Sequence, residues 1–174
     1  MVDALESGVQ RLILRKGGIA EGRGGFRPEN QRFLLFPTLF HQQRDQVIPL
    51  AQDRYDAISA GLADAETVRI SSWVEVISWQ KLETLAEAQK LRGQHIWRDE
   101  VIAERFSWGR EESIYALFLQ VYVLPRAQVV PMLPVYGGCK SWIELAEDIS
   151  LEGSVAIPYV GDAQFSQPSN RTPT

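Results

Sequence analysis

The first residues that could do chemistry form a basic, glycine-rich segment near the start of the chain. Arg15 and Lys16 end a predicted strand, Gly17 and Gly18 follow them directly, and Arg23 belongs to the same loop. Glycine reaches positive φ at little cost, so such a loop can turn backbone N–H groups and cations toward an anion. The spacing matches neither a Walker P-loop nor a dinucleotide-binding fingerprint. We therefore predict anion binding by these five residues, with a tight turn that needs glycine as the alternative.

The same loop carries a carboxylate that could work with a histidine. Lys16, Glu21 and His41 provide the residue types for acid–base catalysis near neutral pH. His41 follows the end of the next predicted strand, so the three side chains meet only if the glycine loop folds back. They are the candidate catalytic residues. The alternative is that His41, next to a phenylalanine, is a hydrogen-bonded structural residue.

The second histidine lies near an indole and a guanidinium. His95 and Trp97 are two residues apart, and Arg105 follows in a predicted helix. Together they could surround a nucleobase or a sugar, since unpaired bases stack on aromatic and guanidinium planes. The alternative is that the aromatic side chains belong to the hydrophobic core.

A glycine-rich turn in the last third of the chain precedes a predicted helix. Lys140 and Ser141 are predicted to contact an anionic ligand, because Ser141 begins a capping-box pattern and helix N-termini bind anions. The same position favours a reactive thiolate at Cys139. A nucleophilic cysteine needs a base, which only His41 or His95 could provide. We therefore expect Cys139 to be replaceable and the turn to be a structural cap or a ligand contact.

Positive charge is concentrated around the first of these segments. Residues 11–32 contain six basic and two acidic side chains, whereas the whole chain has 18 Lys+Arg, 22 Asp+Glu and a net charge of −4. An acidic protein with one basic, glycine-rich segment favours a local anion site over a basic surface for duplex DNA. The alternative is a solvated loop.

The composition excludes several classes of protein. The 174 residues correspond to one domain, at roughly 150 residues per domain. The single cysteine excludes a disulfide framework, and with two histidines it leaves no predicted metal site. No apolar run approaches the roughly 20 residues of a membrane span, and residues 1–20 lack the long apolar core typical of a secretory signal. We expect a soluble, cytoplasmic protein without a membrane partner, and the sequence identifies no cofactor.

Hydrophobic periodicity predicts the elements that must position these residues. The expected strands are residues 9–15, 32–36, 67–77, 113–124, 128–132 and 155–160. The expected helices are residues 43–62, 82–93 and 141–148, with a short helix from residue 99. The first two strands are predicted to form an antiparallel hairpin across the glycine-rich connection. The strand 113–124 is apolar on both faces, which predicts a central position in the sheet.

Because strands and helices do not alternate one for one, we predict an α+β fold. The expected architecture is a mixed, mostly antiparallel sheet of about five or six strands with about three or four packed helices. One domain is expected over residues 1–160. Residues 161–174 are polar and without periodicity, which predicts a disordered tail.

In combination, these motifs resemble a bacterial family catalogued as domain of unknown function 1802. The resemblance covers about residues 4–146 and rests on the segments 12–21, 33–42, 95–97, 105–106 and 136–142. It implies no assigned activity, although an association of members with restriction–modification-type domains favours work on nucleic acids. Such chains usually open with a stretch containing Lys-Glu-Trp. Its absence here predicts a truncated N-terminal element or a misassigned start.

Three classes of function stay open. The first is a binding module for a nucleotide, or for a nucleic-acid end or single strand. The second is a small hydrolase or nuclease that uses the Lys/Glu/His cluster, although the sequence lacks the Asp and Glu-x-Lys pattern of restriction nucleases. The third is a scaffold subunit whose site is a protein interface. In either of the first two classes we expect one pocket lined by Lys16, Glu21, His41, His95 and Lys140.

Overall fold

Five strands and four α-helices lie within the residues that the computed structural model describes, which are 1–16, 30–38, 44–62, 66–109, 111–137 and 142–161. The strands are β1 (Leu12–Arg15), β2 (Arg32–Leu34), β3 (Thr67–Leu82), β4 (Ile114–Pro131) and β5 (Val155–Ile157). The helices are α1 (Val2–Glu6), α2 (Pro49–Leu62), α3 (Leu85–Gln89) and α4 (Asp99–Ser107), with 3-10 turns η1 (Arg44–Gln46) and η2 (Pro134–Tyr136). The predicted α+β class is confirmed.

The strands form one antiparallel sheet in the order β1-β4-β3-β2, and β5 pairs with β4 beyond the end of β1. β4 is therefore central, as its apolar sequence predicts. Its first four residues, 114–117, are buried, because helices cover one face of this part of the sheet and apolar side chains cover the other. The predicted strand at residues 128–132 is the far end of β4 rather than a separate strand.

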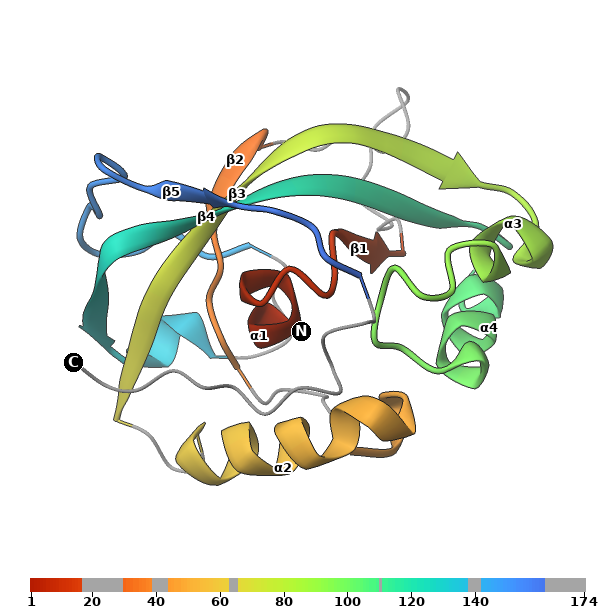
Figure 1. Cartoon of the computed structure of the whole chain (residues 1–174), viewed down its shortest axis with the longest axis horizontal. Coiled ribbons are helices and arrows are strands. Elements are labelled where there is room, and N and C mark those ends of the chain that lie inside the picture. The colour runs from red at the N-terminus through yellow and green to blue at the C-terminus, as the bar shows by residue number, and fades with distance from the viewer. Residues whose placement is uncertain (17–29, 39–43, 63–65, 110, 138–141, 162–174) are drawn as a thin grey trace.

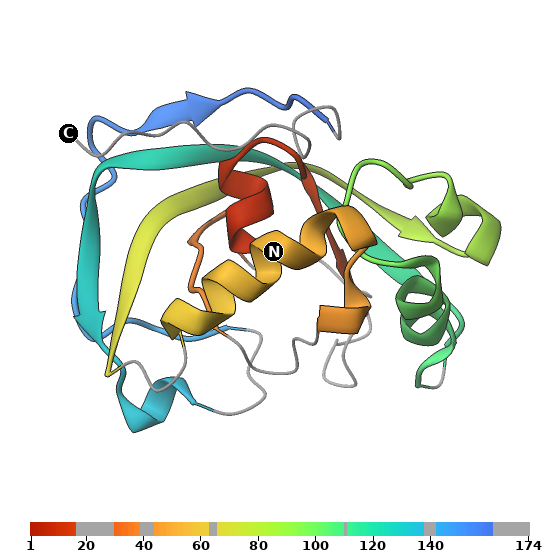
Figure 2. The same cartoon turned by 60° about the horizontal axis from the view of Figure 1, so that its bottom comes forward.

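β3 and β4 are long strands that bend sharply, as Figure 2 shows. The register passes from the pair Ile70 and Gln128 to the pair Ser72 and Val123, so that four residues of β4 lie opposite Ser71 alone. A second irregularity lies in β3 between Val76 and Ser78. Extra residues on one strand bend it and increase its twist. The sheet therefore curves around α1 and leaves α2 on the open side (Figure 1).

The predicted hairpin between the first two strands is wrong. β1 pairs with β4 through Arg15 and Tyr115, whereas β2 pairs with β3 through Phe33 and Val74. The two short strands thus lie on opposite edges of the sheet. The physical reason is that a long connection does not fix a hairpin register as a two-residue turn does. Each short strand instead pairs with a long, apolar strand.

The helices match their predictions unevenly. α2 begins at Pro49, which suits the first turn of a helix, and α4 begins at Asp99 as expected. The predicted helix 82–93 is shorter, because β3 continues to Leu82 and a capping box at Thr84 starts α3. α1 was not predicted at all.

The predicted helix at residues 141–148 is wrong for its described part, since residues 142–148 form no helix. Leu145 and Ile149 instead pack against the core cluster that contains Val68 and Trp73. The burial of Leu145 and Ile149 stabilises this non-helical segment more than the capping pattern would stabilise a helix. Ser141 itself lies outside the described residues.

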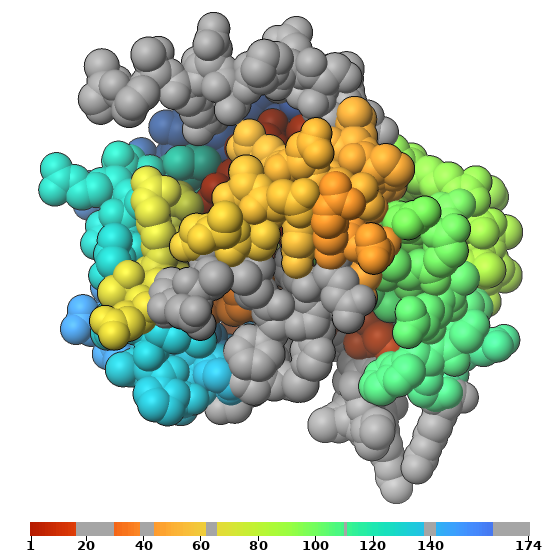
Figure 3. Space-filling model, turned by 90° about the horizontal axis from the view of Figure 1, so that it is seen from below, coloured from red at the N-terminus to blue at the C-terminus, as the bar shows by residue number. Residues whose placement is uncertain are grey.

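Two larger core clusters hold the helices to the sheet. One joins β1 and the start of β4 to α2 and α4, with Leu12, Ile102 and Ile114 almost completely buried. The other packs Leu5 of α1 against Leu117 and neighbouring side chains of β4. In Figure 3, α2 crosses the middle of the open face, between α4 and the start of β3.

Candidate functional site

Three segments that the sequence singled out meet around Trp142. The guanidinium carbon of Arg15 lies 5.2 Å from the centre of the Trp142 ring. The ring of Phe33 meets the same indole edge-on, with centroids 4.8 Å apart and planes at 84°. Both geometries are favourable, the first through the charge–quadrupole attraction and the second as a T-shaped aromatic pair. We call Arg15, Phe33 and Trp142 the aromatic–basic junction.

The junction spans the sheet from one edge to the other. Arg15 belongs to β1 and Phe33 to β2, which are the two outer strands of the order β1-β4-β3-β2. Trp142 contacts both residues, so the segment that carries it bridges the two edge strands. Phe33 and Trp142 are partly buried, so part of their surface remains open to solvent.

A second aromatic pair fixes the segment that carries Trp142. Phe36, just after β2, meets Tyr136 edge-on with ring centroids 5.6 Å apart. The Tyr136 hydroxyl accepts a hydrogen bond of 2.8 Å from the Ala146 backbone N–H. The chain on both sides of Trp142 is thus held against the segment that follows β2. This anchoring limits the positions that the indole can take.

Lys16 points away from the junction toward the end of α4. Its ammonium group donates to the carbonyl oxygens of Phe106 at 2.7 Å and Ser113 at 2.9 Å, and also to that of Glu111. Burial lowers the pKa of Lys16, and the charges of Glu111 and Glu112 partly offset this. Three acceptors for three N–H donors give Lys16 a structural role in joining β1 to α4 and β4. Its predicted catalytic role stays a prediction.

His95, Trp97 and Arg105 lie together, but inside the protein. The Arg105 guanidinium carbon lies 4.4 Å from the Trp97 ring centre, and His95 Nδ1 accepts the Trp97 backbone N–H at 3.2 Å. His95 is 3% exposed and Trp97 6%. Burial lowers the pKa of both His95 and Arg105. This burial favours a role of these side chains in core packing. The predicted contact of His95, Trp97 and Arg105 with a base or sugar stays a prediction.

The remaining predicted site residues lie outside the described part of the chain. They are Gly17, Gly18, Glu21, Arg23, His41, Lys140 and Ser141, and Cys139 belongs with them. The expected single pocket can therefore be judged only for Lys16 and His95, and neither lines the cavity between α1 and α2. Within the described ranges, no group of three or more His, Cys, Asp or Glu side chains could hold a metal ion. No described helix is long and apolar enough to cross a membrane.

In the sequence, Phe33 and Trp142 belong to the motif segments 33–42 and 136–142 but carry no predicted role. Their common signal is a large aromatic residue next to a predicted strand end or turn. Contact between them is not encoded locally, because the two residues are more than 100 positions apart in the sequence. The residues of α1 and α2 that line the cavity between these helices carry no motif signal.

Comparison with known proteins agrees with the motifs. A family model described as a domain of unknown function, DUF1802, matches residues 1–171. The chain belongs to this family. No curated protein and no solved structure matches the chain. The aromatic–basic junction and the buried cluster around Trp97 are therefore arrangements of motif residues within a DUF1802 domain.

Proposed function

We propose that this protein is a binding module for ligands that combine an aromatic base with a phosphate, which means a nucleotide or a single-stranded nucleic acid. The observation that supports this most is the Arg15 guanidinium 5.2 Å above the partly buried Trp142 ring. Bases stack on aromatic and guanidinium planes, and arginine binds phosphate through several N–H donors. The junction offers both kinds of contact at one place.

The chain around the junction supports the same ligand class. Arg15 opens the basic, glycine-rich segment, and Trp142 directly follows Lys140 and Ser141. The predicted phosphate-binding residues are thus close neighbours in sequence of the stacking residues. The Lys16 contacts weigh against the hydrolase alternative, since its three N–H donors already have carbonyl acceptors.

Binding of a fluorescent single-stranded oligonucleotide and of a mononucleotide tests the proposal. Trp142→Leu removes the stacking surface, and Trp108→Leu is the control because Trp108 is 65% exposed and outside the junction. Loss of one stacked base costs about 1–3 kcal/mol, so we expect Trp142→Leu to weaken binding roughly tenfold. The control variant should bind like the wild type.

The relative affinities for the oligonucleotide and the mononucleotide distinguish a single strand from a nucleotide as the ligand. An oligonucleotide that binds much more tightly than the mononucleotide indicates a single strand, and equal affinities indicate a nucleotide. The proposal is overturned if neither ligand binds, if duplex DNA binds best, or if both tryptophan variants behave alike.

A further inference from the structure

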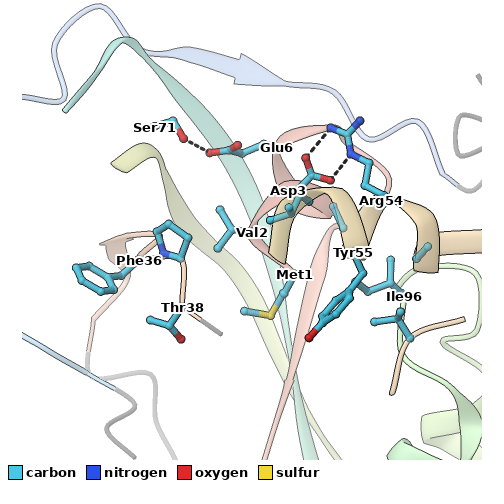
Figure 4. A pocket seen from close by; sticks show the side chains of 15 residues that line it. Met1, Val2, Asp3, Glu6, Phe36, Thr38, Arg54, Tyr55, Ser71 and Ile96 are labelled. Carbon is cyan, nitrogen blue, oxygen red and sulfur yellow. Dashed lines mark hydrogen bonds and ion pairs between the residues drawn. The ribbon is translucent and has the colours of Figure 1, made fainter. Parts of the chain in front are cut away.

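A cavity of about 310 Å³ lies between α1, α2 and the segment that follows β2. Figure 4 shows side chains from all three elements turned into it. Its volume is within the range of small-ligand sites, which starts at about 300 Å³. A small organic molecule with one aromatic ring is the size of ligand that we consider for it.

The walls of the cavity are largely apolar. Val2 comes from α1, Ile58 from α2, and Ile96 from the loop before α4. Tyr55 adds an aromatic ring, whereas Phe36 lies at one side with its ring turned outward (Figure 4), where it packs against Tyr136. A ligand would therefore place an apolar body, aliphatic or aromatic, in the interior.

One edge of the cavity carries two carboxylates in different situations. Asp3 accepts two hydrogen bonds from Arg54, at 2.6 and 2.7 Å, and this ion pair neutralises it. Among the residues that the structure describes, Glu6 accepts a hydrogen bond from the Ser71 hydroxyl alone, at 2.6 Å. No described cationic side chain forms an ion pair with Glu6. Its second carboxylate oxygen has no hydrogen-bond donor among the described residues.

We infer that this cavity binds a small organic cation, an amine with an apolar aryl or alkyl body, whose ammonium group contacts Glu6. The ammonium supplies the counter-charge that Glu6 lacks, and a hydrogen bond between charged groups is about twice as strong as a neutral one. The apolar body fills the space between α1 and α2. This site is separate from the aromatic–basic junction and goes beyond the proposed function.

An anionic ligand is the main competitor, because a neighbouring cavity shares Glu6 and Ser71 with this one. That second cavity, of about 360 Å³, contains Arg69 and Arg126. Two further residues with cationic groups, Arg54 and Met1, line the apolar cavity itself. Arg54 is already paired with Asp3, and burial lowers the pKa of the Met1 amino group, so neither offers a free positive charge to a carboxylate. Glu6 therefore favours the cation.

Three probes of similar shape test the inference: 2-phenylethylamine, neutral 2-phenylethanol and anionic 3-phenylpropanoate. Calorimetric titration of the wild-type protein should give tightest binding for the amine, by roughly tenfold over the alcohol, and weakest binding for the acid. Glu6→Gln keeps an acceptor for Ser71 and should remove the preference for the amine. Glu152→Gln, at an exposed position, is the matched control and should keep that preference.

A second variant guards against misfolding as an explanation. Ala51 lines the cavity and is 5% exposed, so Ala51→Leu should fill part of the space and block all three probes while the protein stays folded. Arg15→Gln should leave amine binding unchanged, so failure of the nucleotide proposal would not affect this result. Equal binding of amine and alcohol, stronger binding of the acid, binding of no probe, or displacement of the amine by a mononucleotide would each overturn the inference.

Discussion

The guanidinium of Arg15 lies over the Trp142 ring, 5.2 Å from its centre, although the two residues come from opposite ends of the chain. The same indole touches Phe33 on the other edge of the sheet. Trp142 therefore contacts residues of both edge strands. In the sequence, Arg15 stands just before one glycine-containing motif and Trp142 ends the other. This geometry is the basis for the proposed recognition of a base and a phosphate.

Lys16 should contribute to stability rather than to ligand binding. Lys16→Met would leave the carbonyl groups of Phe106, Glu111 and Ser113 without their shared donor. These carbonyl groups are partly exposed, and water replaces the lost donor in part, so we expect a loss of about 0.5–1.5 kcal/mol in the free energy of unfolding, measured in urea. Lys90→Met removes an exposed lysine and should change stability by less than about 0.5 kcal/mol. Equal effects would contradict the structural role of Lys16.

His95 should make the folded state sensitive to mild acid. Burial lowers the pKa of His95 below its ordinary value of 6.5, with Arg105 adding to this and Asp99 opposing it. Between the folded pKa and 6.5 the unfolded chain binds more protons than the folded protein. Stability is therefore lost as pH falls through this window, by at most about 1.4 kcal/mol per pH unit.

His95→Asn isolates this effect. The asparagine carbonyl can still accept the Trp97 N–H, which His95 Nδ1 accepts in the wild type, but it does not titrate. We expect the Tm of the wild type to fall more steeply than that of the variant between about pH 7 and pH 5. His41 is present in both proteins and cancels in the comparison. Parallel curves would show that His95 is not the titrating group.

Two glycines should respond in opposite ways to alanine. Gly8 has φ of 74°, and a Cβ there would collide with the carbonyl oxygen of Pro158, near the end of the described chain. Gly61 lies in α2 with nothing within 4 Å of an added Cβ. Gly8→Ala should lower the Tm, while Gly61→Ala should raise stability by about 0.5–1 kcal/mol, the usual helix preference for alanine. A neutral Gly8→Ala would argue against tight packing at that turn.

Features encoded locally could be predicted from the sequence. β4 was identified as central because it is apolar on both faces, and α2 and α4 follow from helical periodicity and their first-turn residues. The grouping of His95 and Trp97 with Arg105 was also predictable, since a short loop and one helix connect them. In each case the residues that carry the signal are close together in the sequence.

Features that depend on distant segments could not be predicted. Nothing near Arg15 indicates that β1 pairs with β4 rather than with β2. Trp142 contacts one residue of β1 and one of β2, although these strands pair with different long strands and share no local signal. The pairing of Asp3 with Arg54, which closes one edge of the cavity, joins two helices with no shared motif.

The salt dependence of oligonucleotide binding tests the central proposal most directly. Each phosphate contact adds about 0.7 to the slope of log Kd against log salt for a single strand. Arg15→Gln should weaken binding and reduce this slope by about that amount. Arg11→Gln removes the same charge from an arginine just before β1 that lies over Tyr159 instead, at 4.8 Å, and should leave the slope unchanged. Identical slopes for the wild type and Arg15→Gln, or equal losses in both variants, would contradict phosphate recognition at the junction.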